Sequence, residues 1–334
     1  MPYMNRPNEH AKHAILRVLR DIGRAAGAAR IQERLAAAGS DLQPRTVRFY
    51  LLQLDREGFT RTVSRRAGRE LTDRGLEELE CANIVQKVGF IGSRIDSLVY
   101  RMTYDLQAGT GTIVANVAVI PRQGLVRALE VIRPVFVCRL GMGTKLAVVP
   151  EGELVGHTRI PEGHIGLATL CSVTANGILL KQGIPVTSRF GGLIELRERK
   201  PVRFTALIEY SGTTLDPLEA FIRAGMTRVR DVVRTGSGLI GVSFREIPAA
   251  AVADVRRLKE EMERRGLDGI LAVGTPNRPL YDVPVGEGRA GLIVKGGLNP
   301  IAALAETRAE VTFQSLAEVE DIAEFPDYNA APHG

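Results

Sequence analysis

The stretch Ser172–Gly192, SVTANGILLKQGIPVTSRFGG, predicts a helix start that follows a β-branched run and precedes a short apolar segment. Thr174 and Asn176 stand where the N-cap of such a helix belongs. A second stretch, KGGLNPIAALAE from Lys295, repeats the pattern, with Asn299 as the expected N-cap and Pro300 at the first helical position. Two helix N-termini with cationic side chains nearby can hold an anion. The alternative is that both are ordinary capped helices of the fold.

The two helix starts belong to a longer internal repeat. Three matches, at separations of 120, 127 and 123 positions, indicate one unit present twice, over residues 85–196 and 202–320. We expect the two copies to pack about a pseudo-twofold axis and to bring equivalent helix ends to a shared cleft. The matches are Gly92–Leu98 with Gly212–Leu218 (Asp96 on Asp216), Gly111–Pro121 with Gly238–Pro248, and Asn176 with Asn299.

Composition and length are those of a globular protein with two or three domains. The 334 residues include no apolar run of membrane-spanning length, and the polar start MPYMNRPNEHAKH is unlike a signal peptide, so we expect a cytoplasmic protein without a membrane partner. Three scattered cysteines, Cys81, Cys138 and Cys171, encode neither a disulfide framework nor a C-x-x-C metal site. We expect them to be buried or half-buried thiols.

The N-terminal region combines a helical pattern with a concentration of arginine. Helices are expected at residues 10–22, 28–38 and 44–57, followed by extended pieces at 59–63 and 70–72 around a basic turn. This order is the winged helix-turn-helix plan. Seven arginines against Asp55 and Glu57 give the window from Arg45 to Arg69 a charge of +5 out of +6 for the chain. Such a focused basic patch favours a polyanionic partner.

In a winged helix the third helix enters the major groove of double-stranded DNA and the hairpin lies near phosphate or the minor groove. A run of charges is otherwise a solvated face, but here the charges coincide with the helix order and the hairpin. We therefore predict DNA contacts at Arg45, Thr46, Arg48, Phe49 and Tyr50 on the helix and at Arg61, Arg65, Arg66 and Arg69 on the wing. Thr72 is the expected N-cap of a closing helix, and we place the boundary of this domain (1–80) against the second (81–334) near residues 81–85.

The second region alternates strands and helices, which predicts an α+β domain built of two repeated halves. Among its elements we expect a strand at Val135–Leu140. Gly236–Gly241 matches G-x-G-x-x-G, but it follows a helix and enters a strand, the reverse of a dinucleotide-binding site. No P-loop or nucleophile elbow is present, and His157, His164 and Cys171 are too loosely spaced to favour a metal site. We predict no catalytic residues, no metal and no cofactor.

Several long segments together resemble a known family. SVTANGILLKQGIPVTSRFGGLIEL, FTALIEYSGTTLDPLEAFIRAG, GLIGVSFREIPA and GLIVKGGLNPIAALAE are similar to characteristic segments of the NrpR family of transcriptional regulators, and the leading winged helix resembles the N-terminal module of ribonuclease R. The resemblance implies a repressor of nitrogen-assimilation genes whose DNA affinity falls when 2-oxoglutarate binds the C-terminal domain. Some members carry two regulatory domains in tandem, whereas this chain carries one.

If the effector is such a dicarboxylate, it needs charge-assisted donors. Arg189 offers a planar fork for one carboxylate, with Gly191 and Gly192 allowing close approach. The alternative is that Arg189 pairs with an acid such as Glu195 and that the glycines only make a turn. We expect the second carboxylate to be held by Lys295 together with the backbone N–H groups that follow Asn299, or by those that follow Asn176. The full predicted effector set is Thr174, Asn176, Arg189, Gly191, Gly192, Ser211, Thr213, Thr214, Lys295 and Asn299.

Two further classes of function remain open from the sequence. The first alternative is an RNA-binding accessory protein that uses a ribonuclease-type winged helix. The second is a small-metabolite enzyme with a DNA-binding appendage. Preference for duplex DNA with dyad symmetry over structured RNA separates the first class from the regulator, and turnover of a bound ligand separates the second. Because one winged helix reads only a short half-site, we expect a homodimer held by the second region.

Overall fold

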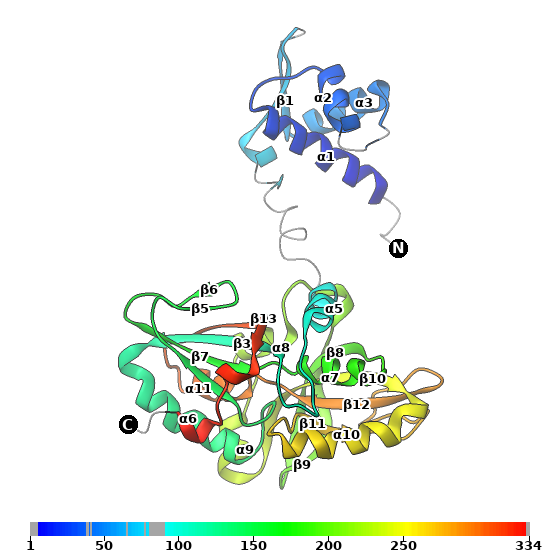
Figure 1. Cartoon of the computed structure of the whole chain (residues 1–334). Coiled ribbons are helices and arrows are strands. Elements are labelled where there is room, and N and C mark those ends of the chain that lie inside the picture. The colour runs from blue at the N-terminus through cyan, green and yellow to red at the C-terminus, as the bar shows by residue number, and fades with distance from the viewer. Residues whose placement is uncertain are drawn as a thin grey trace. The chain divides into compact units, whose positions relative to one another are not determined.

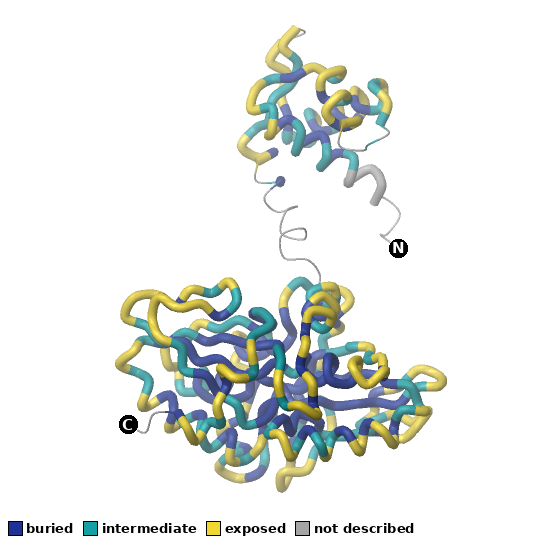
Figure 2. Tube along the Cα trace, in the orientation of Figure 1, coloured by how far each residue is buried: buried dark blue, intermediate teal, exposed yellow. Residues whose placement is uncertain are grey.

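A computed structural model describes residues 6–37, 40, 42–64, 66–76, 78–79 and 91–331, with the backbone alone for residues 6–10. The chain forms two compact units, Met1–Gly89 and Phe90–Gly334, each with its own buried core (Figures 1 and 2). The predicted boundary at residues 81–85 and Cys81 lie outside the described residues. No helix in the described part of the chain is long and apolar enough to cross a membrane.

The N-terminal unit is a winged helix. Its helices are α1 (Arg6–Ile22), α2 (Ala28–Ala37) and α3 (Pro44–Arg56), and its hairpin pairs β1 (Thr60–Ser64) with β2 (Gly68–Leu71) antiparallel. In each helix, apolar side chains recur three and four positions apart and form one buried face. These faces meet in the core, to which α1 contributes Leu16, α2 Leu35 and α3 Leu51. Thr72 Oγ1 accepts the N–H of Gly75, so the predicted cap of the closing helix is confirmed.

The second unit contains two antiparallel sheets with helices packed against them (Figure 1). The four-stranded sheet has the order β13-β3-β7-β4 and the five-stranded sheet the order β11-β12-β10-β8-β9. The strands are β3 (Thr112–Pro121), β4 (Leu146–Val149), β7 (His164–Leu170), β8 (Thr187–Arg197), β9 (Lys200–Glu209), β10 (Gly238–Pro248), β11 (Ile270–Val273), β12 (Arg289–Lys295) and β13 (Thr312–Asp321), with a small separate hairpin of β5 (Leu154–Val155) and β6 (Thr158–Arg159). The helices are α5 (Ile91–Arg101), α6 (Leu125–Val137), α7 (Thr174–Lys181), α8 (Pro217–Arg223), α9 (Val229–Thr235), α10 (Val252–Arg264) and α11 (Asn299–Ala305).

The repeat is visible in the order of these elements. The series β3, α6, β4, β7, α7, β8 recurs as β10, α10, β11, β12, α11, β13, as expected for two halves with pseudo-twofold symmetry. The last strand of each series crosses over. β8 pairs with β10 of the other half, and β13 pairs with β3. Each sheet is therefore completed by a strand from the other half, which the sequence comparison did not predict.

The structure corrects the repeat register at two places. Thr174, not Asn176, is the counterpart of Asn299, because each is the first residue of its helix. The backbone before each helix also bonds in the same way: the N–H of Cys171 donates to the carbonyl of Val114, and the N–H of Gly296 donates to the carbonyl of Gly241. The match of Asp96 with Asp216 is also wrong. Asp96 lies inside α5, whereas Asp216 is the N-cap of α8 and accepts the N–H groups of Leu218 and Glu219.

The predicted strand Val135–Leu140 is wrong as well. Residues 135–137 continue α6, which has Pro134 in its interior, and residues 138–140 follow its end. A proline removes one backbone donor and disfavours a helix. The helix nevertheless runs on, since Ile132, Val135 and Phe136 are buried in the core that α6 shares with α11. Tertiary burial overrides the local signal here.

Candidate functional site

The exposed face of α3 is the candidate DNA-reading surface. Arg45 and Arg48 are exposed and have no acidic partner in the described part of the chain, and Phe49, the residue after Arg48, is 54% exposed. Thr46 is half-buried, and Tyr50 is turned into the core with its ring 5.6 Å from that of Phe49. The helix thus offers two cations and one apolar side chain to a partner, while Tyr50 holds the helix in place.

The arginines of the wing differ from one another. Arg69 donates to Asp55 at 2.7 Å, and Thr60 donates to the same carboxylate at 2.6 Å, so Asp55 ties the wing to α3. Arg61 pairs with Glu70 at 2.8 Å across the hairpin. Arg66 is exposed, with no such partner among the described residues, and Arg65 lies outside them. Of the described wing arginines, Arg66 is the one whose charge is not already shared with an acid.

In the second unit the two helix starts are braced against the sheets by their first residues. Asn299, fully buried, accepts the N–H of Gly241 at 2.9 Å and donates to the carbonyls of Gly241 (2.9 Å) and Leu140 (2.7 Å). Thr174, equally buried, contacts the N–H and C=O of Val114 at 3.1 and 3.2 Å. The N-caps predicted at Thr174, Asn176 and Asn299 are wrong, because α7 and α11 begin after Val173 and Leu298 without a side-chain cap. The matching form of the two sets of hydrogen bonds shows that Thr174 and Asn299 fix strand to helix in both halves.

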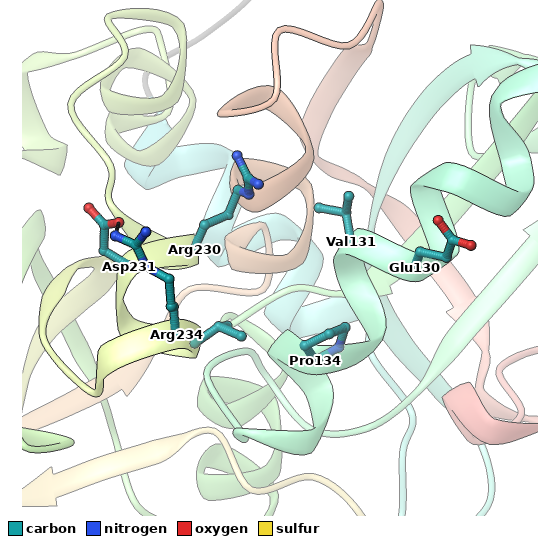
Figure 3. A pocket seen from close by; sticks show the side chains of 7 residues that line it. Glu130, Val131, Pro134, Arg230, Asp231 and Arg234 are labelled. Atoms are coloured by element: carbon teal, nitrogen blue, oxygen red, sulfur yellow. Dashed lines mark hydrogen bonds and ion pairs between the residues drawn. The ribbon is translucent and has the colours of Figure 1, made fainter.

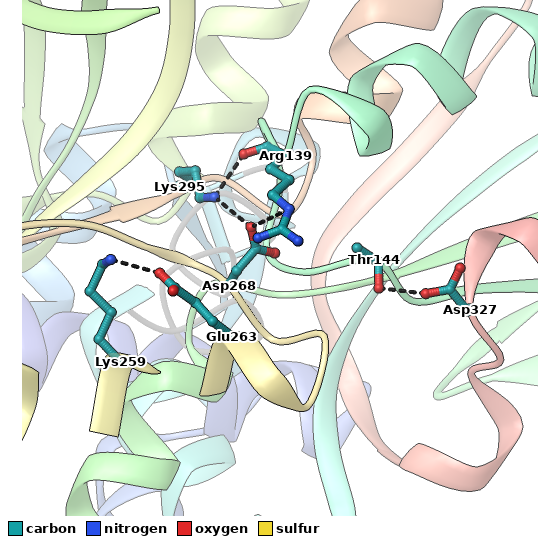
Figure 4. Close-up of polar contacts among 7 residues, drawn as sticks. All are labelled: Arg139, Thr144, Lys259, Glu263, Asp268, Lys295 and Asp327. Carbon is teal, nitrogen blue, oxygen red and sulfur yellow. Dashed lines mark hydrogen bonds and ion pairs between the residues drawn. The ribbon is translucent and has the colours of Figure 1, made fainter. Parts of the chain in front are cut away.

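Asn176 and Lys295 are buried next to these starts and reach different partners. Asn176 Nδ2 donates to Ser188 Oγ at 3.0 Å, and its Oδ1 has no donor within the described residues. Lys295 Nζ donates to the carbonyl of Arg139 at 2.7 Å and lies 3.3 Å from Asp268 Oδ2 (Figure 4). Burial lowers the pKa of Lys295, while Asp268 acts in the opposite direction. Lys295 therefore already has an internal counter-ion.

Arg189 is also engaged. Its Nη1 lies 2.7 Å from Glu246 Oε1, and its guanidinium lies 5.2 Å from the centre of the Phe190 ring. The acid is Glu246 rather than Glu195, which holds Arg197 and Arg203. Gly191 and Gly192 lie within β8 and not in a turn. A Cβ at Gly191 would meet Pro217 at 2.5 Å, and one at Gly192 would meet the carbonyl of Ala206 at 2.7 Å, so neighbouring chain makes the close approach.

Three hydroxyl residues complete the predicted effector set. Ser211 is exposed, and Thr213 and Thr214 are half-buried in the turn before α8. Thr213 Oγ1 donates to the carbonyl of Leu215 at 2.8 Å and accepts its N–H, a local turn contact.

A small cavity of about 20 Å³ lies where the equivalent loops before α7 and α11 meet. Its walls include Ser172 and Asn116 from the first half and Ser243 and Gly297 from the second. None of the ten predicted effector residues lines it. A space of this size holds about one water molecule, so the loops are closed on each other in this structure.

Buried ionisable groups surround this cavity that the sequence analysis did not single out. Burial raises the pKa of Asp216 to about 6, Glu219 acting in the same direction, and it raises the pKa of Cys171 to about 11. Arg245, 1% exposed, reaches Ser172 Oγ at 3.0 Å. A signal was present in the repeat, since Arg245 and Glu246 align with Ala118 and Val119, so one half carries charges where the other is apolar.

Two open hollows lie elsewhere on the unit. One, of about 350 Å³, has Glu130, Val131 and Pro134 of α6 on one side and Arg230 and Arg234 of α9 on the other (Figure 3). The other, of about 550 Å³, lies by the ends of α6 and α10 next to the groups of Figure 4, with Arg139 and Asp268 in its wall. Arg234 is paired with Asp231 at 3.1 Å. Both are surface hollows, and in the second one Arg139 lies 3.9 Å from Asp268.

The residues weighed as metal ligands do not come together. Within the described residues there is no group of three histidine, cysteine or acidic side chains that could hold a metal ion. His157 lies 3.5 Å from Glu318, and His164 contacts the carbonyl of Glu162. Of the described cysteines, Cys171 is buried and Cys138 half-buried, both as free thiols.

A winged helix joined to a two-halved α+β unit defines a class, the transcriptional regulators that couple a DNA-reading domain to a regulatory one. The chain matches the family model of NrpR regulatory domains NRD1 and 2 over residues 88–327 and that of the ribonuclease R winged-helix domain over residues 13–79. It belongs to the NrpR family. The match also places it among nitrogen-related transcriptional regulators, the coarse description that its relatives share.

Relatives cover most of the chain. It is 35% identical over 307 residues to the global nitrogen regulator NrpRI of Methanosarcina mazei, covering 92% of this chain and 94% of that protein. It is 29% identical to the global nitrogen regulator NrpR of Methanococcus maripaludis, of which it spans 54%. A solved nitrogen repressor-like protein from Methanococcus jannaschii matches 72% of this chain and 98% of its own, with 26% identity and a TM-score of 0.61.

Proposed function

We propose that the protein is a ligand-responsive DNA-binding repressor of nitrogen-assimilation genes, released from its operator by 2-oxoglutarate. The observation that carries the proposal is one chain that joins a family-matched regulatory unit to a winged helix, whose reading face holds arginines without an acidic partner in the described residues. The names of its relatives, global nitrogen regulators, support the nitrogen context. The chain uses no cofactor and catalyses no reaction, and it acts in the cytoplasm.

The DNA half of the proposal assigns α3 to the major groove. Arg45 and Arg48 contact base edges or phosphate, and the exposed ring of Phe49 lies against an apolar edge such as a thymine methyl group. The wing adds Arg66, with Arg61 and Arg69 close to the backbone of the duplex. Tyr50 and Thr46 position the helix. Because one such module spans only a half-site, two chains bind as a homodimer through the second unit.

The effector half assigns a small dicarboxylate to the second unit, near the helix starts before α7 and α11. Of the ten predicted residues, Asn176 retains an acceptor that no described donor reaches, whereas Thr174, Lys295, Asn299 and Arg189 are engaged inside the unit. Binding that involves the engaged groups exchanges an internal partner for the ligand. That exchange is a physical means of coupling the ligand to the shape of the unit.

Fluorescence anisotropy tests the proposal. Duplex fragments are selected from a random pool with the full chain, and affinity is measured with and without 2-oxoglutarate. We expect dyad-symmetric duplexes to be selected and the ligand to weaken their binding. Preference for structured RNA would favour the RNA-binding function that the ribonuclease R match suggests. Consumption of 2-oxoglutarate during incubation would indicate an enzyme.

A further inference from the structure

Arg245 is a buried cation with few partners among the described residues. It lies in the middle of β10, 1% exposed, and its Nη2 donates to Ser172 Oγ at 3.0 Å. Nε and Nη1 are buried without an acceptor in the same part of the chain. Burial lowers the pKa of Arg245 to about 10, so it stays charged at neutral pH. A buried unpaired charge destabilises a fold, and an apolar side chain of similar volume would cost less.

The surroundings of Arg245 supply no counter-ion in the described part of the chain. Glu246, the next residue on the strand, pairs with Arg189. Cys171 and Tyr210, which lie near Arg245, are neutral at pH 7 because burial raises the pKa of both. Asp216 accepts two N–H groups of α8 and makes no ion pair with Arg245. The charge of Arg245 is therefore available to an anion from outside the chain.

Asn176 is a second buried polar residue near Arg245 whose hydrogen bonds are incomplete within the described residues. Arg245 faces Ser188 across the β10–β8 pair, and Ser188 Oγ accepts from Asn176 Nδ2. Asn176 Oδ1 is buried and has no donor from any residue that the structure describes. Since a serine hydroxyl either donates or accepts, the amide can turn and present its NH₂ group instead. Arg245, Ser172 and Asn176 thus bring charged and neutral donors together beneath the start of α7.

We infer that Arg245, with Ser172 and Asn176, forms a buried recess for one carboxylate group of a small organic acid. The inference rests on the proposed function, in which such an acid is the effector, and it moves the anchoring cation from Arg189 to Arg245. A carboxylate accepts several charge-assisted hydrogen bonds from one guanidinium. Ser172 also lines the cavity between the two loops, which is too small for a dicarboxylate. The loop before α7 moves when the acid enters.

The test compares variants of the full chain by calorimetric titration with 2-oxoglutarate and by thermal denaturation. Arg245→Met keeps the volume and removes the charge, and Arg203→Met is the matched control at an exposed arginine of the same sheet, which pairs with Glu195 and is not among the predicted effector residues. We expect Arg245→Met to be at least as stable as wild type without ligand, because it relieves a buried charge. We expect its affinity to fall thirtyfold or more, roughly the loss of a charged hydrogen-bonding partner, and Arg203→Met to bind within about threefold of wild type.

Equal binding by Arg245→Met and wild type would overturn the recess and leave the effector proposal standing. If Arg245→Met does not fold, Arg245→Lys keeps the charge without the planar fork, and we expect it to bind about tenfold more weakly. Loss of folding in both variants would show a structural role and overturn the inference. If wild type does not bind 2-oxoglutarate, the effector proposal fails separately. The same comparison with malate, succinate and glutamate then decides, since a recess that none of them occupies in an Arg245-dependent way is refuted.

Discussion

Replacing Asn299 with alanine tests whether this residue holds the regulatory unit together or is available to a ligand. The buried amide makes three internal hydrogen bonds, one to the N–H and one to the carbonyl of Gly241 and one to the carbonyl of Leu140. Each is worth about 1 kcal/mol, and the groups left unpaired add a desolvation cost. We expect Asn299→Ala to lower the free energy of unfolding by about 3 kcal/mol without any ligand. In a domain of this size that lowers the melting temperature by about 6–12 °C.

Scanning calorimetry of the full chain measures this change directly. The melting of the unit containing residues 90–334 should shift, while that of the winged helix stays in place, since Asn299 belongs to the second unit. Asn329→Ala, at an exposed asparagine of the same unit, is the matched control and should stay within about 0.5 kcal/mol of wild type. A shift of less than about 2 °C for Asn299→Ala would refute a structural role and leave the side chain available to an effector.

Three further changes test other parts of the molecule. Replacing Arg65 and Arg66 together with alanine should weaken binding to every duplex and reduce the slope of log affinity against log salt by about one unit for each phosphate that the wing no longer reaches; unchanged affinity in anisotropy would count against the wing. Light scattering of the full chain at micromolar concentration should give the mass of two chains, and a monomer would contradict the proposed homodimer. Because burial raises the pKa of Asp216 to about 6, the folded state binds that proton more tightly than the unfolded chain, and stability is lost as pH rises from about 4 to about 6. Asp216→Asn keeps an oxygen to cap α8 and does not titrate, so its free energy of unfolding should rise relative to that of wild type by about 2–3 kcal/mol between these two pH values. Urea unfolding measures this difference, and a difference that does not change with pH would refute the raised pKa.

Local patterns in the sequence are sufficient to predict the winged helix. Apolar spacing, the break at Gly58 and the cap at Thr72 each depend on neighbours within a few positions, and α1, α2, α3 and the hairpin lie where these signals indicate. The repeat is equally visible, because two copies of one pattern can be compared without knowing how they pack. Its register is less secure. Matching Asn176 with Asn299 relies on residue identity, whereas the hydrogen bonds to Val114 and Gly241 show that Thr174 performs the same task with a different side chain.

The candidate site escapes prediction for a different reason. The sequence favours Arg189 because a cation beside two glycines resembles an anion site, but the acid that pairs with it, Glu246, is 57 positions away. Arg245 gives no such local signal, because it stands inside a strand whose neighbouring residues are largely apolar, and only the comparison of the two halves distinguishes it. The fold is needed to show that it is buried and that no acid of the described residues pairs with it. Long-range pairing decides which charges are free, and spacing along the chain carries little information about it.

The crossed strands limit how a ligand can act on the regulatory unit. β8, from the first half, pairs with β10 of the second half throughout its length, and β13, from the second half, pairs with β3 of the first half. Separating the halves would break both ladders, which costs far more than the few kcal/mol a small ligand supplies. A movement confined to the loop before α7 breaks neither. That loop is joined to β8 through α7 and residues 182–186, and β8 in turn carries Arg189 and Ser188. If an acid binds at Arg245 as we propose, it acts on β8, a strand of the first half that lies in the sheet of the second, and a shift of β8 would change both halves at once.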